Sequence, residues 1–494
     1  MKARLRPLLT PSSRADRFMT DAFRKTGLPS QPLIMGLSVF VILMWVGAMF
    51  NDGDTFWHLV AGNWIIDHRA VPHVDPFSCT FAGKPWLAHE WLGELLMAGV
   101  FRLCGWSGLA LLTAGAGGLT VYLVAGVASR WLGGLVLWVT VLLGLGMIAP
   151  HFLVRPHILV LPLLALWCGE LVEARTENRQ PGWWLVLVMI LWANMHGSFL
   201  FGLCLICPFA LEAFLAAAPG ERRPVIIGWG GFGLAALIAS LITPHGFEGL
   251  LFPIKLLIMP GITGVMEWDA SDFSRPSMLE IGLLGAVFVI IRQRAEVPLI
   301  RLIILLALVH LTFKHSRQEI MLGLLGVLLL AEPLGRTFTG SLNGKPGRVP
   351  LTRSAMIFAG VAVVGLAALR LALPVAEPRT ANTPVEALAA VPEGLRRQPV
   401  FNTYNVGGYL VWKGVRPFID GRTDMYGADF FAAYNLAMSP DLPALEKSLR
   451  DYKVQWALLR NGSGAAAVME GLPGWKRLHT DQGYVVYVRD GAVY

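Results

Sequence analysis

The chain has 494 residues, of which 55% are hydrophobic and only 15% charged, and its mean hydropathy is +0.56. A soluble domain usually carries about 25% charged residues, so this composition excludes a soluble enzyme, a disordered chain and a secreted disulfide scaffold. The formal net charge is +8, but the basic residues lie beside apolar runs, so we expect no nucleic-acid partner. The sequence predicts a polytopic α-helical membrane protein.

About eleven membrane spans are expected. A basic leader, residues 1–32, precedes the first apolar run and predicts a cytoplasmic N-terminus. Residues 33–374 then form the predicted transmembrane region, with a large first extracytoplasmic loop at 51–106. Several runs are shorter than the roughly 20 residues that cross a bilayer, so two of them could be re-entrant. The apolar runs are 33–50, 107–129, 131–150, 157–173, 183–195, 198–217, 224–243, 277–292, 297–312, 319–334 and 354–374.

The distribution of charge and histidine supports this topology. Each of the five predicted cytoplasmic connections contains Lys or Arg, as the positive-inside rule requires. Histidines could simply prefer loops, but that preference does not explain their absence from these five connections. The pattern predicts a multi-pass protein of the cytoplasmic (inner) membrane with a functional polar face outside. Ten of the eleven histidines lie in or beside the opposite connections, at positions 58, 68, 73, 89, 151, 157, 196, 245, 310 and 315.

Residues 375–494 differ in character and predict a small extracytoplasmic α/β domain. Short apolar runs alternate with polar helical patterns, and Asp441 is a candidate N-cap of the second helix. The expected helices are 429–438 and 443–452. The expected strands are 399–402, 408–412, 416–420, 455–459 and 484–489.

The first outside loop carries the densest group of candidate catalytic residues. Asp52 and Asp54 flank a glycine directly after the first span, and two such carboxylates can act as a base or bind a divalent cation such as Mg²⁺ or Mn²⁺. The structural alternative is a helix-ending turn in which Asp54 caps a helix that starts at the next residue. The further catalytic candidates are His58, His89 and Glu90. The last two do not form an HExxH zinc motif, because position 93 is glycine.

Basic and imidazole side chains in the other outside connections are candidate ligands for a lipid phosphate. Each one taken singly could instead extend toward the lipid headgroups. The candidates are Arg155, His157, His196, His245, Lys314 and Arg317. In the tail, Asp420, Arg422 and Asp424 could bind an acceptor or form a polar strand end.

Together, these features resemble the GT-C superfamily of integral membrane glycosyltransferases. The chain is also similar to bacterial membrane proteins with a GDTxWHL…HEWL first loop and an FN…GGYL(I/V)W…(V/F)IDGRxDxY tail, at 52–59, 89–92, 401–412 and 418–426. The superfamily resemblance implies a polyprenyl-phosphate-linked sugar donor, membrane lipids as surroundings, and Asp52 and Asp54 as base or cation ligands. Arg155 and Arg317 are the candidates for the carrier phosphate by their chemistry alone.

The expected function is therefore transfer of a sugar, with inversion, to a glycan, lipid or protein acceptor outside the cytoplasm. A transporter or flippase for a lipid-linked glycan is one alternative, although no internal repeat is evident. A haem-handling protein is another, but the chain lacks the WGxxWxWD loop of such proteins. A third alternative is a non-catalytic envelope assembly subunit.

Overall fold

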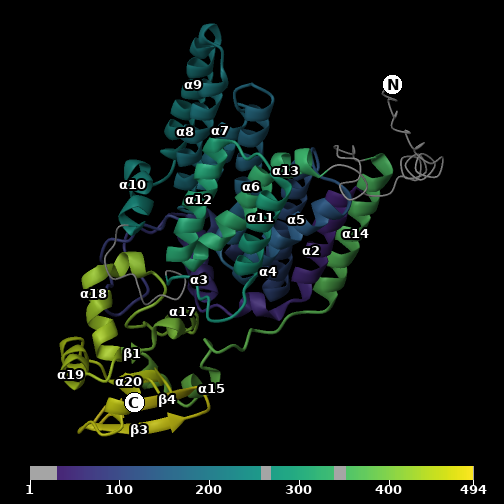
Figure 1. The fold of residues 1–494 in the computed structure, drawn as a ribbon. Coiled ribbons are helices and arrows are strands. Elements are labelled where there is room, and N and C mark those ends of the chain that lie inside the picture. The colour runs from purple at the N-terminus through teal and green to yellow at the C-terminus, as the bar shows by residue number, and fades with distance from the viewer. Residues whose placement is uncertain (1–29, 258–268, 339–351, 493–494) are drawn as a thin grey trace, which may run out of the picture.

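The computed structural model describes residues 30–257, 269–338 and 352–492, so most of the predicted leader at 1–32 lies outside it. Long helices run side by side as a bundle, and a small sheet with its own helices lies beyond one end (Figure 1). The bundle helices are α2 (Gln31–Trp45), α4 (Trp91–Ala128), α5 (Gly134–Ile148), α6 (Pro156–Thr176), α7 (Leu185–Ala193), α8 (Phe199–Ala216), α9 (Arg222–Ser240), α11 (Met278–Gln293), α12 (Leu299–Lys314), α13 (Glu319–Thr337) and α14 (Arg353–Ala372).

Every predicted apolar run falls on one of these helices. Within the described ranges, seven helices are long and apolar enough to cross a membrane. Helix α7 has only nine residues, or about 14 Å at 1.5 Å per residue, against a hydrocarbon core of about 30 Å. The apolar helices indicate a multi-pass membrane protein, and the number of eleven spans stays a prediction.

The outer faces of the bundle are apolar. Leu234 on α9, Ile291 on α11 and Val364 on α14 are each at least 60% exposed. Soluble monomers rarely expose apolar patches larger than a few hundred Å². These faces therefore suit contact with lipid rather than with water.

Helix α4 is 38 residues long because two helices meet at Gly105. This glycine has φ 57° and ψ −150°, a conformation that is not helical and that favours glycine. The segment before it lies against α3 (Asp54–His68), where Gly62 meets Glu94, and the segment after it lies against α2, where Gly36 meets Gly118. The chain thus changes direction at Gly105, between the two parts of α4.

The sheet has four strands in the order β1-β2-β4-β3. Strands β1 (Val400–Asn402) and β2 (Trp456–Arg460) are parallel, and β4 (Tyr484–Arg489) is antiparallel to both β2 and β3 (Trp475–Thr480). Three of the predicted strands are confirmed as β1, β2 and β4. Strand β3 was not predicted, because its sequence WKRLHT is polar and lies at the sheet edge.

Two strand predictions are wrong. Residues 408–412 belong to helix α17 (Gly407–Trp412), which packs against α3, and a short apolar run does not distinguish a buried helix from a strand. Residues 416–420 are irregular, because their polar groups bind the first loop. Helices α18 (Thr423–Met438) and α19 (Leu442–Asp451) contain most of the two predicted helices, and the side chain of Asp441 accepts the N–H of Ala444 at 2.9 Å.

Candidate functional site

The acidic pair lies where the chain enters α3. Asp54 is the first residue of this helix, and Oδ1 of Asp52 accepts its backbone N–H at 2.8 Å. The side chain of Asp52 thus accepts an N–H at this helix start. A negative charge is favourable at a helix N-terminus. The two carboxylates differ in access, since 2% of the Asp52 side chain is exposed and 19% of the Asp54 side chain.

Arg155 joins the two carboxylates. Its Nη2 lies 2.7 Å from Oδ1 of Asp52 and 3.0 Å from Oδ2 of Asp54, and its Nε also contacts Asp52. Arg155 is extended because it precedes Pro156, the first residue of α6. The guanidinium of Arg155 thus bridges the pair. The divalent cation expected at Asp52 and Asp54 stays a prediction.

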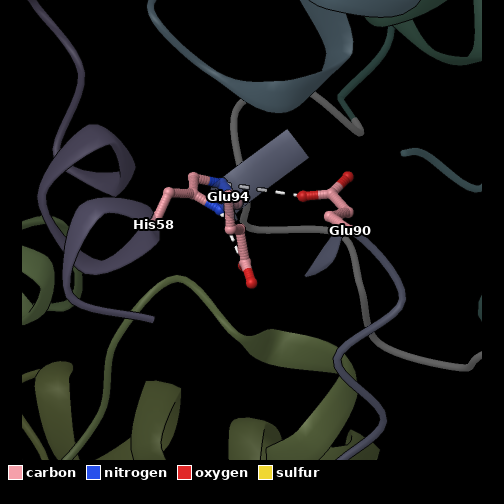
Figure 2. A group of neighbouring side chains, drawn as sticks. All are labelled: His58, Glu90 and Glu94. Carbon is pink, nitrogen blue, oxygen red and sulfur yellow. Dashed lines mark hydrogen bonds and ion pairs between the residues drawn. The ribbon is translucent and has the colours of Figure 1, made fainter. Parts of the chain in front are cut away.

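A second polar group lies one helical turn further along α3, on the same face as Asp54. Nδ1 of His58 is 3.1 Å from Oε1 of Glu94, and Nε2 of His58 is 3.7 Å from Oε2 of Glu90 (Figure 2). Glu90 and Glu94 stand at the start of α4. All three side chains are buried or nearly so. The structure therefore brings together two parts of the first loop that are 32 residues or more apart in the sequence.

Glu90 is surrounded by histidines. Its Oε1 lies 3.3 Å from Nε2 of His196 and 3.6 Å from Nε2 of His89. Burial raises the pKa of Glu90, but the hydrogen bond from His89 and the charge of that imidazole outweigh it and hold the pKa well below its usual range. Burial lowers the pKa of His58 and of His196 to about 3, so both imidazoles are neutral at pH 7.

The predicted phosphate ligands are only partly gathered at this cluster. His157 lies beside His196, with ring centroids 6.3 Å apart, and the charge of Arg317 contributes to lowering the pKa of His196 after burial. His245 binds the carbonyl of Ala88 at 3.2 Å, next to His89 in sequence. Lys314 is exposed at the C-terminal end of α12.

Two glycines of the tail pack directly against the segment that carries the acidic pair. A Cβ added to Gly421 would overlap the Asp54 carboxylate, and a Cβ added to Gly408 would overlap the carbonyl of Gly53. Only glycine permits so close an approach of two chain segments. The first-loop motif and the tail motif, which are more than 300 residues apart, therefore form one unit.

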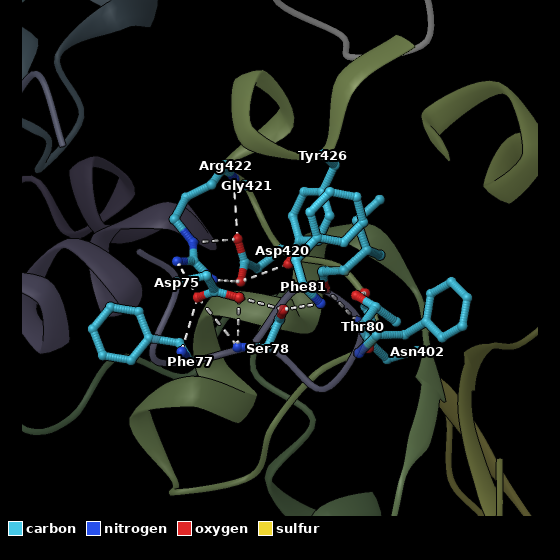
Figure 3. A network of polar contacts seen from close by, with 12 residues as sticks. Asp75, Phe77, Ser78, Thr80, Phe81, Asn402, Asp420, Gly421, Arg422 and Tyr426 are labelled. Atoms are coloured by element: carbon cyan, nitrogen blue, oxygen red, sulfur yellow. Dashed lines mark hydrogen bonds and ion pairs between the residues drawn. The ribbon is translucent and has the colours of Figure 1, made fainter. Parts of the chain in front are cut away.

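A buried ionic network locks the tail to the first loop (Figure 3). Nη1 of Arg422 lies 2.7 Å from Oδ1 of Asp75, and its Nη2 lies 2.6 Å from Oδ2 of Asp420, which also accepts the hydroxyl of Tyr426 at 3.1 Å. Asp420 and Arg422 are fully buried, so an acceptor does not reach them in this structure, and the geometry favours their structural role. Burial raises the pKa of Asp424, whose charge acts on His89.

Comparison with known proteins identifies the architecture. Neither a protein-family model nor a curated protein sequence matches this chain. The structure resembles the archaeal oligosaccharyltransferase AglB from Archaeoglobus fulgidus, in complex with an inhibitory peptide and a dolichol-phosphate, with a TM-score of 0.54 and 11% identity over 90% of this chain and 70% of that chain. The chain shares the fold of this enzyme. An apo structure of the Archaeoglobus fulgidus oligosaccharyltransferase gives a TM-score of 0.53 and 12% identity over 86% and 69% of the two chains.

Sequence reasoning missed Glu94. Its signal was its spacing, because Glu90 and Glu94 are four residues apart, as are Asp54 and His58, and each pair therefore shares one helical face. The role of Gly421 was also missed, although it lies within the tail motif.

Proposed function

We propose that this chain is a membrane glycosyltransferase that moves a sugar from a polyprenyl-phosphate-linked donor to an acceptor outside the cytoplasm. The observation that carries the proposal is the acidic pair beside Arg155, within a fold shared with an oligosaccharyltransferase. The dolichol-phosphate and the peptide belong to that neighbour's structure. They motivate the donor class and leave the acceptor open among a glycan, a lipid and a protein.

The two carboxylates take different roles in this proposal. Asp54 is the more accessible and serves as the base that removes the proton from the acceptor hydroxyl, a contribution of roughly 10²–10⁴-fold. Asp52 is buried and fixes the helix start and Arg155. A single displacement by the activated hydroxyl inverts the anomeric carbon.

The leaving phosphate would bind Arg155, whose Nη2 lies beside the Asp54 carboxylate, and Arg317 on the side of His196. Guanidinium groups bind phosphate through paired, charge-assisted hydrogen bonds. Among the remaining candidates, His157, His196 and His245 supply ring nitrogens near the cluster, and Lys314 would act from the exposed end of its helix.

An apolar cavity supports a lipid-linked donor. It has a volume of about 510 Å³ and lies between α4, α7 and the turn after α9. Asn194, two residues before His196, lines it and accepts the indole N–H of Trp91 at 2.9 Å. An isoprenoid chain held there would end close to Glu90 and the imidazoles. Its lining residues are Trp91, Leu92, Leu187, Ile190, Leu191, Asn194, Ile242, Thr243 and Pro244.

The proposal is tested in a deletion strain that carries wild-type or variant chains. We expect that Asp54→Asn fails to restore the missing envelope glycan or glycolipid, as measured by mass spectrometry, while the chain still inserts in the membrane. Asp67→Asn is the matched control, because Asp67 is an exposed carboxylate at the other end of α3 and should restore it fully.

Full restoration by Asp54→Asn would remove Asp54 from the base role and favour a non-catalytic assembly subunit. Movement of a lipid-linked glycan across liposomes by the purified chain, without transfer of its sugar, would instead favour a flippase.

A further inference from the structure

The His58 cluster contains donor atoms arranged for an ion. In the part of the chain that the structure describes, His58, Glu90 and Glu94 are the one group of three in which a donor atom from each lies within 4.8 Å of the others. Figure 2 shows the three side chains directed toward one another. The group offers one nitrogen and two carboxylates from two helices that pack together.

One oxygen of this group has nothing to bind among the described residues. Oε2 of Glu94 is buried and has no hydrogen-bond partner, and only 1% of the Glu94 side chain is exposed. A buried polar atom without a partner costs free energy, so the described residues alone do not fully satisfy this cluster. This observation is independent of the clustering of the three residues.

The distance between His58 and Glu90 also favours an ion. Nε2 and Oε2 are 3.7 Å apart, which is too long for a hydrogen bond. Two ligands that each lie about 2.0–2.2 Å from one tetrahedral ion are separated by about 3.4 Å. With the Nδ1 proton of His58 donated to Glu94, the lone pair of Nε2 faces the Glu90 carboxylate, and a cation between them would satisfy both.

The surroundings hold the donors in place. His89 and His196 both approach Oε1 of Glu90, which leaves its Oε2 directed toward His58. Glu94 binds the second ring nitrogen of His58. Metal-binding histidines commonly have this second nitrogen fixed by a carboxylate or a carbonyl.

We propose that Nε2 of His58 and Oε2 of Glu90 bind a divalent first-row transition-metal ion of the Zn²⁺ or Mn²⁺ class, while Glu94 holds the other ring nitrogen of His58. The imidazole nitrogen selects such an ion over Ca²⁺ and Mg²⁺, which prefer oxygen ligands only. The ion lies one helical turn from Asp54 and is distinct from the carboxylate pair that Arg155 bridges. Metal binding here does not depend on the activity proposed above.

The test measures metal on the full chain, purified in detergent through a tag without histidine and stripped with a chelator. After addition of Zn²⁺ and gel filtration, we expect about one Zn²⁺ per chain by plasma mass spectrometry. The zinc-edge X-ray absorption spectrum should show only nitrogen and oxygen neighbours, with the outer scattering of histidine. A wild-type chain that retains no Zn²⁺, or one whose zinc lacks the histidine scattering, would overturn the proposal.

Variants locate the ion. His58→Ala should lose Zn²⁺, and Glu94→Gln should weaken its binding by about 10- to 100-fold. His68→Ala is the matched control on α3, because His68 is exposed at its C-terminal end. Asp54→Asn should keep the metal even where it loses sugar transfer, which separates this proposal from the proposed function. Retention of Zn²⁺ by a monodisperse His58→Ala chain contradicts the assignment.

Discussion

Replacing Gly421 with alanine tests whether the tail shapes the acidic site. The new Cβ would lie 2.5 Å from Cγ of Asp54 and 2.8 Å from its Oδ2, whereas ordinary contacts begin at 3.4 Å. The Asp54 carboxylate therefore has to move by about 1 Å, and a displacement of that size at a catalytic group can reduce the rate about 100-fold. Gly421 has no left-handed backbone conformation, so alanine adds no backbone strain there.

The assay compares the rate of sugar transfer with the midpoint of thermal unfolding for the same preparations. We expect Gly421→Ala to lose about 100-fold in rate, with an unfolding midpoint close to that of the wild type. Gly471→Ala is the matched control, because a Cβ at Gly471 meets nothing within 4 Å. A Gly421→Ala chain that folds and transfers sugar within twofold of the wild type would refute the reasoning.

Three further predictions concern the ionic network and the carrier. Replacing Arg422 with methionine leaves Asp75 and Asp420 buried without their cation. This replacement should lower the free energy of unfolding by roughly 3–5 kcal/mol. An unchanged denaturation midpoint would contradict the prediction. Burial raises the pKa of Asp75, but Arg422 and hydrogen bonds outweigh it and hold the pKa below its ordinary value. The network thus stabilises the fold above about pH 4, and this stabilisation is lost as the pH falls further. Limited proteolysis should therefore cleave the tail faster at pH 3 than at pH 6. Equal cleavage rates at the two pH values would argue against this role of the network. Arg317→Ala should weaken binding of a polyprenyl phosphate roughly tenfold, since a charged hydrogen bond contributes about 1.5–3 kcal/mol, and an equal Kd would exclude that contact.

The helices were predictable because lipid-facing and core helices both require long apolar runs. Every such run in the sequence became a helix, and Asp441 gave the start of α19. The strands were harder to predict than the helices, because residues 408–412 have the same apolar character in α17 as they would have in a buried strand. Their state is decided by packing against α3, and no local pattern records that packing.

The identity of most candidate site residues was predictable, but their contacts were not. Asp52, Asp54, His58 and Glu90 stood out because polar residues next to a membrane span are costly and few. Which of them meet depends on contacts between distant segments. Arg155 was expected to face a phosphate, yet it lies on the acidic pair, since the start of α6 packs beside the start of α3.

Turnover by the purified chain tests the central claim most directly. The chain would be placed in proteoliposomes with synthetic polyprenyl-phosphate sugars and an envelope extract as acceptor, and released polyprenyl phosphate would be followed by mass spectrometry. We predict release coupled to the appearance of a glycosylated product, and no release with Asp54→Asn. Equal release by the wild type and by Asp54→Asn, or none by a wild-type chain offered the full range of sugars, would contradict the account.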